Sequence, residues 1–425
     1  DLTSSKTRKL RGGDMIKVKQ LIILCGLAIL MLGLFGCDDP VPDDVENLYP
    51  QKQILWPSIA DTPWPMLRHD PQGTNRSQYS GGQLGEVVFG YFVEGFQSEA
   101  SLSLDTDNNV FRLFTNSGYG SQFNVNPDGE TMWFTQIGRL MEAVSTLLHT
   151  PNNIGLVPLY KEKTIVSMDL QTGIANQTIY LGYEPLHLKI DRSGNMYVHS
   201  SDRTTFNSYT PAGEMRWSIT DLGWMSGEFQ FSPDGEVIYV MGADSLYALS
   251  TDGEKIWSYK KIGGTYTFLL DNSGCLYLGE GNSTITCLLP TGGVRWAVAA
   301  EEIDMERFFS GNSQTMDTKG NFYFNGSMID GPSGIFSLDN EGNFRWFREH
   351  RLTTDLICDQ DDNIYFGYSE GPYKMTSIDS DGNLNWQVEY GNGHGRMAFT
   401  PAIGSNGYVY YPIKDGYDYD IIVVR

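Results

Sequence analysis

Short runs of aromatic and β-branched residues alternate with glycine-containing turns along most of the chain. Runs such as SLYALS at 245–250 and TITCLLP at 284–290 have the length of single strands. Asp-Gly pairs between such runs are typical of hairpins. Helical periodicity is absent from most of the sequence outside an apolar stretch at 21–35. The pattern predicts an all-β protein made of antiparallel hairpins.

One phrase, D-x-x-G-x-x-Y, recurs through the chain. Three copies are regular, four are looser and one is degenerate, which makes eight. The regular copies are DRSGNMY from Asp191, DNSGCLY from Asp271 and DTKGNFY from Asp317; the looser copies are DTDNNVF from Asp105, SPDGEVIY from Ser232, DQDDNIY from Asp359 and GSNGYVY from Gly404; the degenerate copy is TPNNIGL from Thr150.

A second phrase, a glycine turn followed by a strand that usually contains tryptophan, follows each of the first seven copies. Its tryptophans are Trp133, Trp217, Trp257, Trp296, Trp346 and Trp386. Their spacings are 84, 40, 39, 50 and 40 residues; the first spans two periods because the second copy lacks tryptophan. The spacing of 50 indicates an insertion at 299–312.

A four-stranded antiparallel unit of about 40 residues is a propeller blade. Eight first phrases and seven second phrases leave the last blade one strand short. The segment 85–95, GEVVFGYFVEG, can supply that strand and close the ring, which leaves no open sheet edge. We therefore expect an eight-bladed β-propeller at 61–425, closed by an N-terminal strand that pairs in the last blade.

The first 60 residues indicate export and anchoring. Met15 is the expected start, and residues 1–14 an upstream extension. Lys17 and Lys19 precede the fifteen-residue apolar run, which suits a signal peptide better than a membrane span. The run ends in LFGC, which resembles the bacterial lipobox, so 1–36 would be removed and Cys37 lipidated. Residues 37–60 read as an acidic, flexible tether; an ordinary signal peptide or uncleaved anchor is the alternative.

The charge excludes some partners. The whole chain carries −22, and removal of the six basic and two acidic residues before Cys37 leaves −26. Nucleic acid and bare anionic membrane would be repelled by this surface. The lipid anchor is therefore the expected contact with a membrane, on the periplasmic or surface side of the inner or outer membrane.

The segment 64–80, WPMLRHDPQGTNRSQYS, resembles the lead-in of the quinoprotein (PQQ-type) repeat propellers. The matching residues are Trp64, Gly73, Asn75, Arg76 and Ser77, and the turn-then-tryptophan phrase resembles the repeat of that family. The family includes dehydrogenases and non-catalytic lipoproteins, among them the propeller lipoprotein of the outer-membrane barrel-assembly machine. The resemblance covers roughly 61–425 and implies the fold more firmly than an activity.

By that resemblance a PQQ dehydrogenase would need adjacent cysteines, calcium-ligating acids and long active-site insertions. This chain has no adjacent cysteines and mostly short loops. We therefore expect neither PQQ nor calcium as a cofactor, and similarity to the non-catalytic lipoprotein branch.

The repeated residues favour scaffold roles. We expect the tryptophans to pack between blades rather than to stack on a cofactor, and the repeat aspartates to cap turns rather than to act as acids and bases. The pair His69 and Asp70 lies in the lead-in, where a structural role is favoured over catalysis. No metal-site or GxSxG pattern is present, so we expect no catalytic residue and no metal.

Three cysteines remain in the expected propeller. Cys275 and Cys287 flank GEGNS, a hairpin tip, and would lie roughly opposite each other on paired strands. A disulfide between them is possible in an exported protein, although proximity is expected more than the bond. Cys358 is left over.

Loops on one face of the ring carry the strongest binding signal. The insertion 299–312 joins two blades, and the same class of connections, with the second hairpins, supplies aromatic residues. The proposed binding residues are Trp224, Arg307, Phe308, Phe309, Tyr368, Tyr373 and His394, with Tyr119, Tyr417 and Tyr419 nearby. Alternatively, these side chains cover the channel mouth.

The sequence favours a membrane-anchored, non-enzymatic propeller that binds an envelope protein or polymer through this face. A divergent PQQ-type oxidoreductase or a glycan-active enzyme on the same fold is the alternative hypothesis.

The expected anchor can be tested by replacing its attachment atom. Cys37→Ser should release the protein from washed membranes into the soluble fraction, because no thiol remains for lipidation. Quantitative immunoblotting of the two fractions measures this. Retention of the variant in carbonate-washed membranes would contradict lipidation at Cys37.

Overall fold

The computed structural model describes most of the chain after residue 49. The described ranges are 50–92, 97–116, 119–138, 146–149, 153–225, 227–261, 267–281, 284–308, 314–351, 354–369, 371–392, 396–397, 399–414 and 420–425. The compact unit that contains them is Asn47–Arg425. The expected signal peptide, Cys37 and most of the tether lie outside the described residues. Among the described residues, no helix is long and apolar enough to span a membrane.

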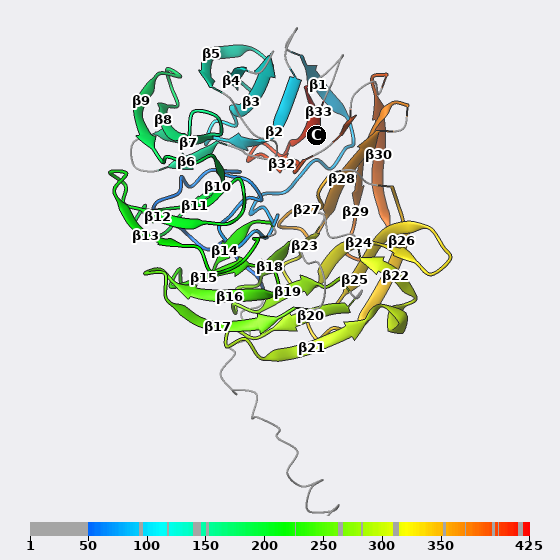
Figure 1. Ribbon diagram of the computed structural model, residues 1–425. Coiled ribbons are helices and arrows are strands. Elements are labelled where there is room, and N and C mark those ends of the chain that lie inside the picture. The colour runs from blue at the N-terminus through cyan, green and yellow to red at the C-terminus, as the bar shows by residue number, and fades with distance from the viewer. Residues whose placement is uncertain are drawn as a thin grey trace, which may run out of the picture. The chain divides into compact units, whose positions relative to one another are not determined.

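The strands form eight antiparallel sheets arranged as blades around an axis (Figure 1). In blades 1 to 7 the chain runs from the innermost strand to the outermost strand before it passes to the next blade. The predicted eight-bladed propeller is confirmed.

The first four blades have four strands each. Their bounds are, for blade 1, β2 Gln97–Leu104, β3 Val110–Asn116, β4 Tyr119–Val125 and β5 Thr131–Gly138; for blade 2, β6 Leu147–His149, β7 Ile154–Leu159, β8 Thr164–Asp169 and β9 Ala175–Tyr180; for blade 3, β10 Pro185–Ile190, β11 Met196–Ser200, β12 Phe206–Tyr209 and β13 Met215–Ile219; for blade 4, β14 Phe229–Phe231, β15 Val237–Met241, β16 Ser245–Ser250 and β17 Lys255–Lys260.

Blades 6 and 8 have inner strands in two parts. The remaining bounds are, for blade 5, β18 Phe268–Leu270, β19 Leu276–Gly279, β20 Thr284–Leu288 and β21 Val294–Ala299; for blade 6, β22 Met305–Phe308, β23 Gln314–Met316, β24 Phe322–Met328, β25 Ser333–Leu338 and β26 Phe344–Glu349, preceded by the 3-10 helix η1 Ala300–Ile303; for blade 7, β27 Ile357–Cys358, β28 Ile364–Ser369, β29 Tyr373–Ile378 and β30 Leu384–Tyr390; for blade 8, β31 Arg396–Met397, β32 Ala402–Ile403, β33 Val409–Lys414, β34 Ile421–Val424 and β1 Val87–Tyr91.

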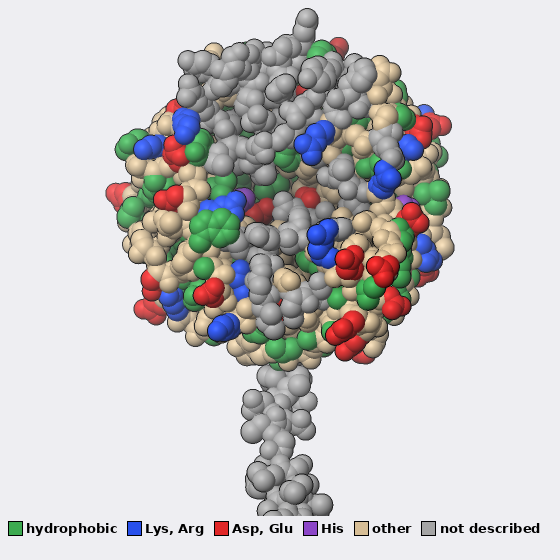
Figure 2. All heavy atoms as spheres, turned by 45° about the vertical axis from the view of Figure 1, so that its right-hand side comes forward, with side chains coloured by type: hydrophobic (Ala, Val, Ile, Leu, Met, Phe, Trp, Pro, Cys, Tyr) green, Lys and Arg blue, Asp and Glu red, His purple; other side chains and the backbone are tan. Residues whose placement is uncertain are grey.

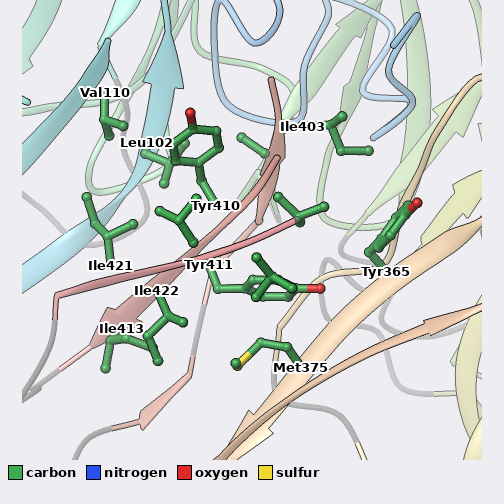
Figure 3. Packing of buried hydrophobic residues seen from close by; sticks show 14 of the residues in the cluster. Leu102, Val110, Tyr365, Met375, Ile403, Tyr410, Tyr411, Ile413, Ile421 and Ile422 are labelled. Carbon is green, nitrogen blue, oxygen red and sulfur yellow. The ribbon is translucent and has the colours of Figure 1, made fainter. Parts of the chain in front are cut away.

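The ring closes in blade 8 as predicted. Strand β1 pairs antiparallel with β34, with Tyr91 opposite Ile421 and Val87 opposite Val424. Apolar residues of blades 1, 7 and 8 meet there in one buried cluster, in which Leu102, Tyr365 and Ile422 come from the three blades (Figure 3). Closure therefore buries the junction between the two ends of the propeller.

The insertion 299–312 differs in part from the expected loop. Its first part forms η1 and β22, and β22 pairs with β24 so that Met305 lies opposite Met328. Strand β23 pairs farther along the same strand, with Gln314 opposite Phe324. The first part of the insertion thus extends the inner strand of blade 6, with Met305 and Phe308 buried.

Each of the six repeat tryptophans lies at the junction with the next blade. The indole N–H of Trp257 donates to the carbonyl oxygen of Pro290 at 2.9 Å. Its ring lies against Gly292, which has φ of 87° and where an added Cβ would come within 2.8 Å of the indole. The other indoles bond in the same way, Trp133 to Leu170, Trp217 to Thr251, Trp296 to Asn340, Trp346 to Ser380 and Trp386 to Gly82.

The repeat aspartates connect a turn to a strand. Asp191 Oδ1 accepts the backbone N–H groups of Ser193 and Asn195, and its Oδ2 accepts the hydroxyl of Tyr197 at 3.0 Å. The same aspartate–tyrosine bond joins Asp271 to Tyr277, Asp317 to Tyr323 and Asp359 to Tyr365. These carboxylates are therefore engaged in structural bonds.

Residues 50–82, which we call the strap, run over one end of the channel before β1 begins. Residues 64–84 contact the blades in order around the ring. The hydrogen bonds are Leu104 N to Trp64 O, Leu148 N to Pro65 O, Lys189 Nζ to Pro71 O, Phe231 N to Pro71 O, Leu270 N to Gln72 O, Asn75 Nδ2 to Gln314 O, Cys358 N to Asn75 O and Leu84 N to Arg425 O. Residues 64–84 therefore connect all eight blades.

Removal of one junction indole tests the packing between blades. Trp257→Ala should lower the free energy of unfolding by about 3 kcal/mol, because it removes the ring on Gly292 and the bond to Pro290. Denaturant unfolding measures the change. Ile256→Ala is the matched control, since Ile256 is 54% exposed, and should cost about 0.5 kcal/mol or less. Equal effects of the two changes would contradict the packing role.

Candidate functional site

The topology divides the connections between two faces. The connections between blades and the second hairpin of each blade lie on one face, which we call the mouth face. The Asp-x-x-Gly turns and the turns before the tryptophan strands lie on the other, which we call the turn face. The strap contacts the turn-face ends of inner strands, such as Leu104 and Cys358.

The proposed binding residues in the described part of the chain all lie toward the mouth face, but they differ in exposure. Trp224 is 49% exposed, Arg307 is exposed and Tyr368 is half-buried under Lys374. Phe309 and His394, like Tyr417 and Tyr419, lie outside the described residues.

Two of the proposed binding residues, Phe308 and Tyr373, are not exposed. Phe308 is 7% exposed, and its ring lies against Gly279 and 5.6 Å from the ring of Phe324. Tyr373 is fully buried. The Phe308 side chain packs on the blades because β22 is a strand of blade 6. This packing agrees with the alternative stated above, in which these side chains cover the propeller instead of binding a partner.

The pair His69 and Asp70 is built into the strap. His69 Nδ1 lies 3.3 Å from Asp70 Oδ2, and its ring meets Trp64 edge to face at 4.9 Å. Asp70 also accepts bonds from the backbone N–H and hydroxyl of Thr74. The hydrogen bond to His69 lowers the pKa of Asp70 despite an opposing effect of burial. These contacts hold the turn of the strap.

The cysteines are buried, free thiols. Cys287 lies opposite Tyr277, two residues beyond Cys275 on the neighbouring strand. Burial raises the pKa of Cys287 well above its usual value, and a hydrogen bond with Cys275 acts in the same direction. The two thiols are therefore neighbours, while Cys358 lies in blade 7.

A cluster of charged side chains fills the channel above the strap. Arg68 is fully buried, and none of its three guanidinium nitrogens has a hydrogen-bond partner. Its positive charge adds to the effect of burial that lowers the pKa of Lys189 in blade 3, and it opposes the burial that raises the pKa of Asp355 beside blade 7. Arg68 thus acts on charged groups of two blades that are four apart in the ring of eight.

Arg68 also has a strained backbone, with φ of 60°. A buried, unpaired cation and a left-handed backbone each destabilise a fold. Such costs at one residue point to a functional constraint rather than to packing.

The groups around Arg68 have altered acidity. Burial raises the pKa of Asp355 to about 7, against the opposing effects of a bond from Thr400 and the charge of Arg68. Burial lowers the pKa of Lys189 to about 8, although Glu228 lies 4.0 Å away. The raised pKa of Asp355 therefore reduces the negative charge beside Arg68 near neutral pH.

The cluster continues toward the mouth face. Burial lowers the pKa of His187 to about 4, so its ring is neutral. Arg203 stacks on exposed Trp224, with its guanidinium carbon 4.8 Å from the ring centroid. Figure 2 shows a hollow near the centre of the ring in which acidic, basic and histidine side chains lie together.

The sequence analysis did not identify Arg68, Lys189, Glu228 and Asp355 as candidate site residues. A weak signal exists in PLHLKI at 185–190, where His187 and Lys189 interrupt an apolar inner strand. Arg68 stands in the lead-in motif, but its approach to residues of blades 3 and 7 depends on the path of the strap. Only the tertiary structure brings these charges together.

Comparisons with known proteins concern the fold. No protein-family model matches the sequence, and neither does any curated protein. The quinohemoprotein alcohol dehydrogenase from Comamonas testosteroni superposes with a TM-score of 0.62 at 12% identity, over 86% of this chain and 80% of that one. BamB from Moraxella catarrhalis superposes with a TM-score of 0.57 at 15% identity, over 80% and 99%.

The chain shares the propeller fold of these two proteins. The resemblance seen in the lead-in and the tryptophan phrase is thus confirmed at the level of the fold. At these identities the likeness does not carry an activity from either protein to this one.

The expected absence of PQQ and calcium stays a prediction. The described residues contain no group of three or more His, Cys, Asp or Glu side chains that could hold a metal ion. The neighbouring thiols of Cys275 and Cys287 are 12 positions apart in the sequence and belong to the sheet of blade 5.

Proposed function

We propose that this chain is a membrane-anchored, non-enzymatic propeller of the cell envelope that binds a protein partner at its mouth face. The partner would place a carboxylate, from an acidic side chain or a chain end, in the channel above the strap. The unpaired, buried guanidinium of Arg68 is the observation that supports this proposal most strongly.

A carboxylate would supply the hydrogen-bond acceptors that the Arg68 guanidinium lacks. Guanidinium groups bind carboxylates through two parallel hydrogen bonds, and such bonds are strong where water is excluded. Lys189 and Arg203 add positive charge, while the raised pKa of Asp355 reduces the opposing negative charge. The cluster is thus suited to an anion although the whole protein carries −22.

The mouth face offers a second contact for the partner. Trp224 is half-exposed and held by Arg203, which gives a rigid aromatic surface beside a cation. Tryptophan and arginine dominate the energy of many protein interfaces. A partner could therefore bind Trp224 at the surface while its acidic group enters the channel.

The proposed envelope location rests on the signal-like run at 21–35 and on Cys37. The fold shared with BamB agrees with a non-enzymatic propeller. The likeness to the alcohol dehydrogenase agrees equally with the alternative of an enzyme.

Photo-crosslinking in the native host tests the proposal. A photoreactive residue at Trp224 should capture a specific envelope protein, whereas the same residue at Phe344, which is 46% exposed on the outer strand of blade 6, should not. In the protein labelled at position 224, Arg68→Met should abolish that crosslink.

In the otherwise unchanged protein, Arg68→Met should raise the free energy of unfolding by about 1–3 kcal/mol, because an unpaired buried cation is removed.

The opposite results would contradict the proposal. A destabilised Arg68→Met variant that keeps the crosslink would assign Arg68 a structural role. Equal capture from positions 224 and 344 would exclude the mouth face as the specific surface. Oxidation of alcohols or sugars after addition of PQQ and calcium would establish the enzyme instead.

A further inference from the structure

The turn face has a pocket between blades 1 and 2, and residues 60–62 of the strap also line it. Its volume is about 580 Å³, within the usual range for small-molecule sites. Its lining includes Asp105, Asn109, Asn124, Trp133, His149 and Gln171.

Blades 3 and 6 show how the same junction is filled elsewhere. In blade 3, Arg216 precedes the junction tryptophan and donates to the hydroxyl of Tyr197 at 2.8 Å and to that of Ser208 at 3.0 Å. In blade 6, Arg345 bonds to Tyr323 at 3.0 Å and to Ser337 at 2.9 Å. An arginine, a tyrosine and a serine thus occupy the space beside the tryptophan.

Blade 1 has different residues at all three positions. Met132 stands where the arginine stands and is 58% exposed, and Phe111 replaces the tyrosine. Asn124 lies opposite Trp133, as Ser208 lies opposite Trp217. These replacements remove the arginine head group and the tyrosine hydroxyl, and the pocket lies in their place.

Two acceptors in the pocket lack the donors that blades 3 and 6 supply. Asn124 is 3% exposed, and its Oδ1 has no hydrogen-bond partner. Asp105 Oδ2 accepts a bond from Asn109 at 2.9 Å, as its counterparts do, but Phe111 has no hydroxyl to donate the second. A ligand hydroxyl could stand where the tyrosine hydroxyl stands in blades 3 and 6.

We propose that this pocket binds a neutral, hydroxyl-rich ligand, a sugar unit, between blades 1 and 2. Hydroxyl groups would donate to Asn124 Oδ1 and Asp105 Oδ2, while the apolar face of the ring lies against Trp133 and Met132. The pocket lining contains no Lys or Arg, so an anionic ligand is disfavoured. The described residues offer no cluster of three metal-ligating side chains, which disfavours a cation site.

Trp133 is positioned for this contact. Its indole N–H donates to Leu170 O at 3.0 Å, and Thr135 Oγ1 donates to Gly173 O at 2.7 Å. These bonds to blade 2 hold the two walls of the pocket together. The site lies on the turn face and is independent of the partner surface proposed for the mouth face.

Calorimetric titration of the full mature chain with neutral hexose and N-acetylhexosamine oligosaccharides tests the proposal. At least one of these probes should bind at a single site. Combined Phe111→Tyr, Met132→Arg and Asn124→Ser should weaken binding by at least about tenfold, because this variant fills the pocket as blades 3 and 6 are filled. Ile256→Arg is the matched control, since it adds arginine before the tryptophan of blade 4, and should leave binding unchanged.

A second variant tests the proposal in case the triple variant does not fold. Asn124→Leu, which removes only the buried acceptor amide, should also weaken binding, with the circular dichroism spectrum unchanged. The proposal is overturned if no neutral sugar binds, if both pocket variants fold and bind as the native protein does, or if Ile256→Arg weakens binding as much as they do. Preference for a polyamine over every sugar would overturn the neutral class and assign the pocket to a cationic ligand.

Discussion

The packing of an indole on a glycine turn joins each of six blades to the next, and the other parts of the structure depend on this junction. Trp257 on Gly292 is one instance, in which the glycine allows close approach and the indole N–H satisfies a turn carbonyl. At the last junction, Trp386 meets Gly82 and Gly85, which come from the N-terminal end of the propeller. The segment before β1 thus replaces the missing turn of blade 8, and ring closure requires both ends of the chain.

Closure also determines what the channel contains. Because the strap must reach blade 8 from the N-terminal side, it passes the inner strands of the other blades and carries Arg68 into a buried position. The scaffold gains hydrogen bonds to every blade, while the channel gains an unpaired cation. The proposed partner site on the mouth face and the proposed sugar pocket on the turn face both arise where a local feature departs from the repeated pattern.

The sequence was sufficient to predict the blades, their number and the closing strand, because turn chemistry and strand length are local and the repeats reinforce one another. It was insufficient for Arg68 and Asp355, which approach only through the path of the strap. The insertion was interpreted as an exposed loop because its length was the signal. The pairing of β22 with β24, with Met305 and Phe308 buried, instead places its first part in a sheet. The pocket beside Asn124 becomes visible only when the blades are compared in three dimensions.

Amide hydrogen exchange of the mature protein tests closure most directly. If β1 completes blade 8, the amides of β34, Ile421–Val424, should exchange as slowly as those of a middle strand such as β16, Ser245–Ser250, because strands cover both edges. Rapid exchange of β34, together with slow exchange of β33, would show an open edge and contradict closure of the ring by the N-terminal strand.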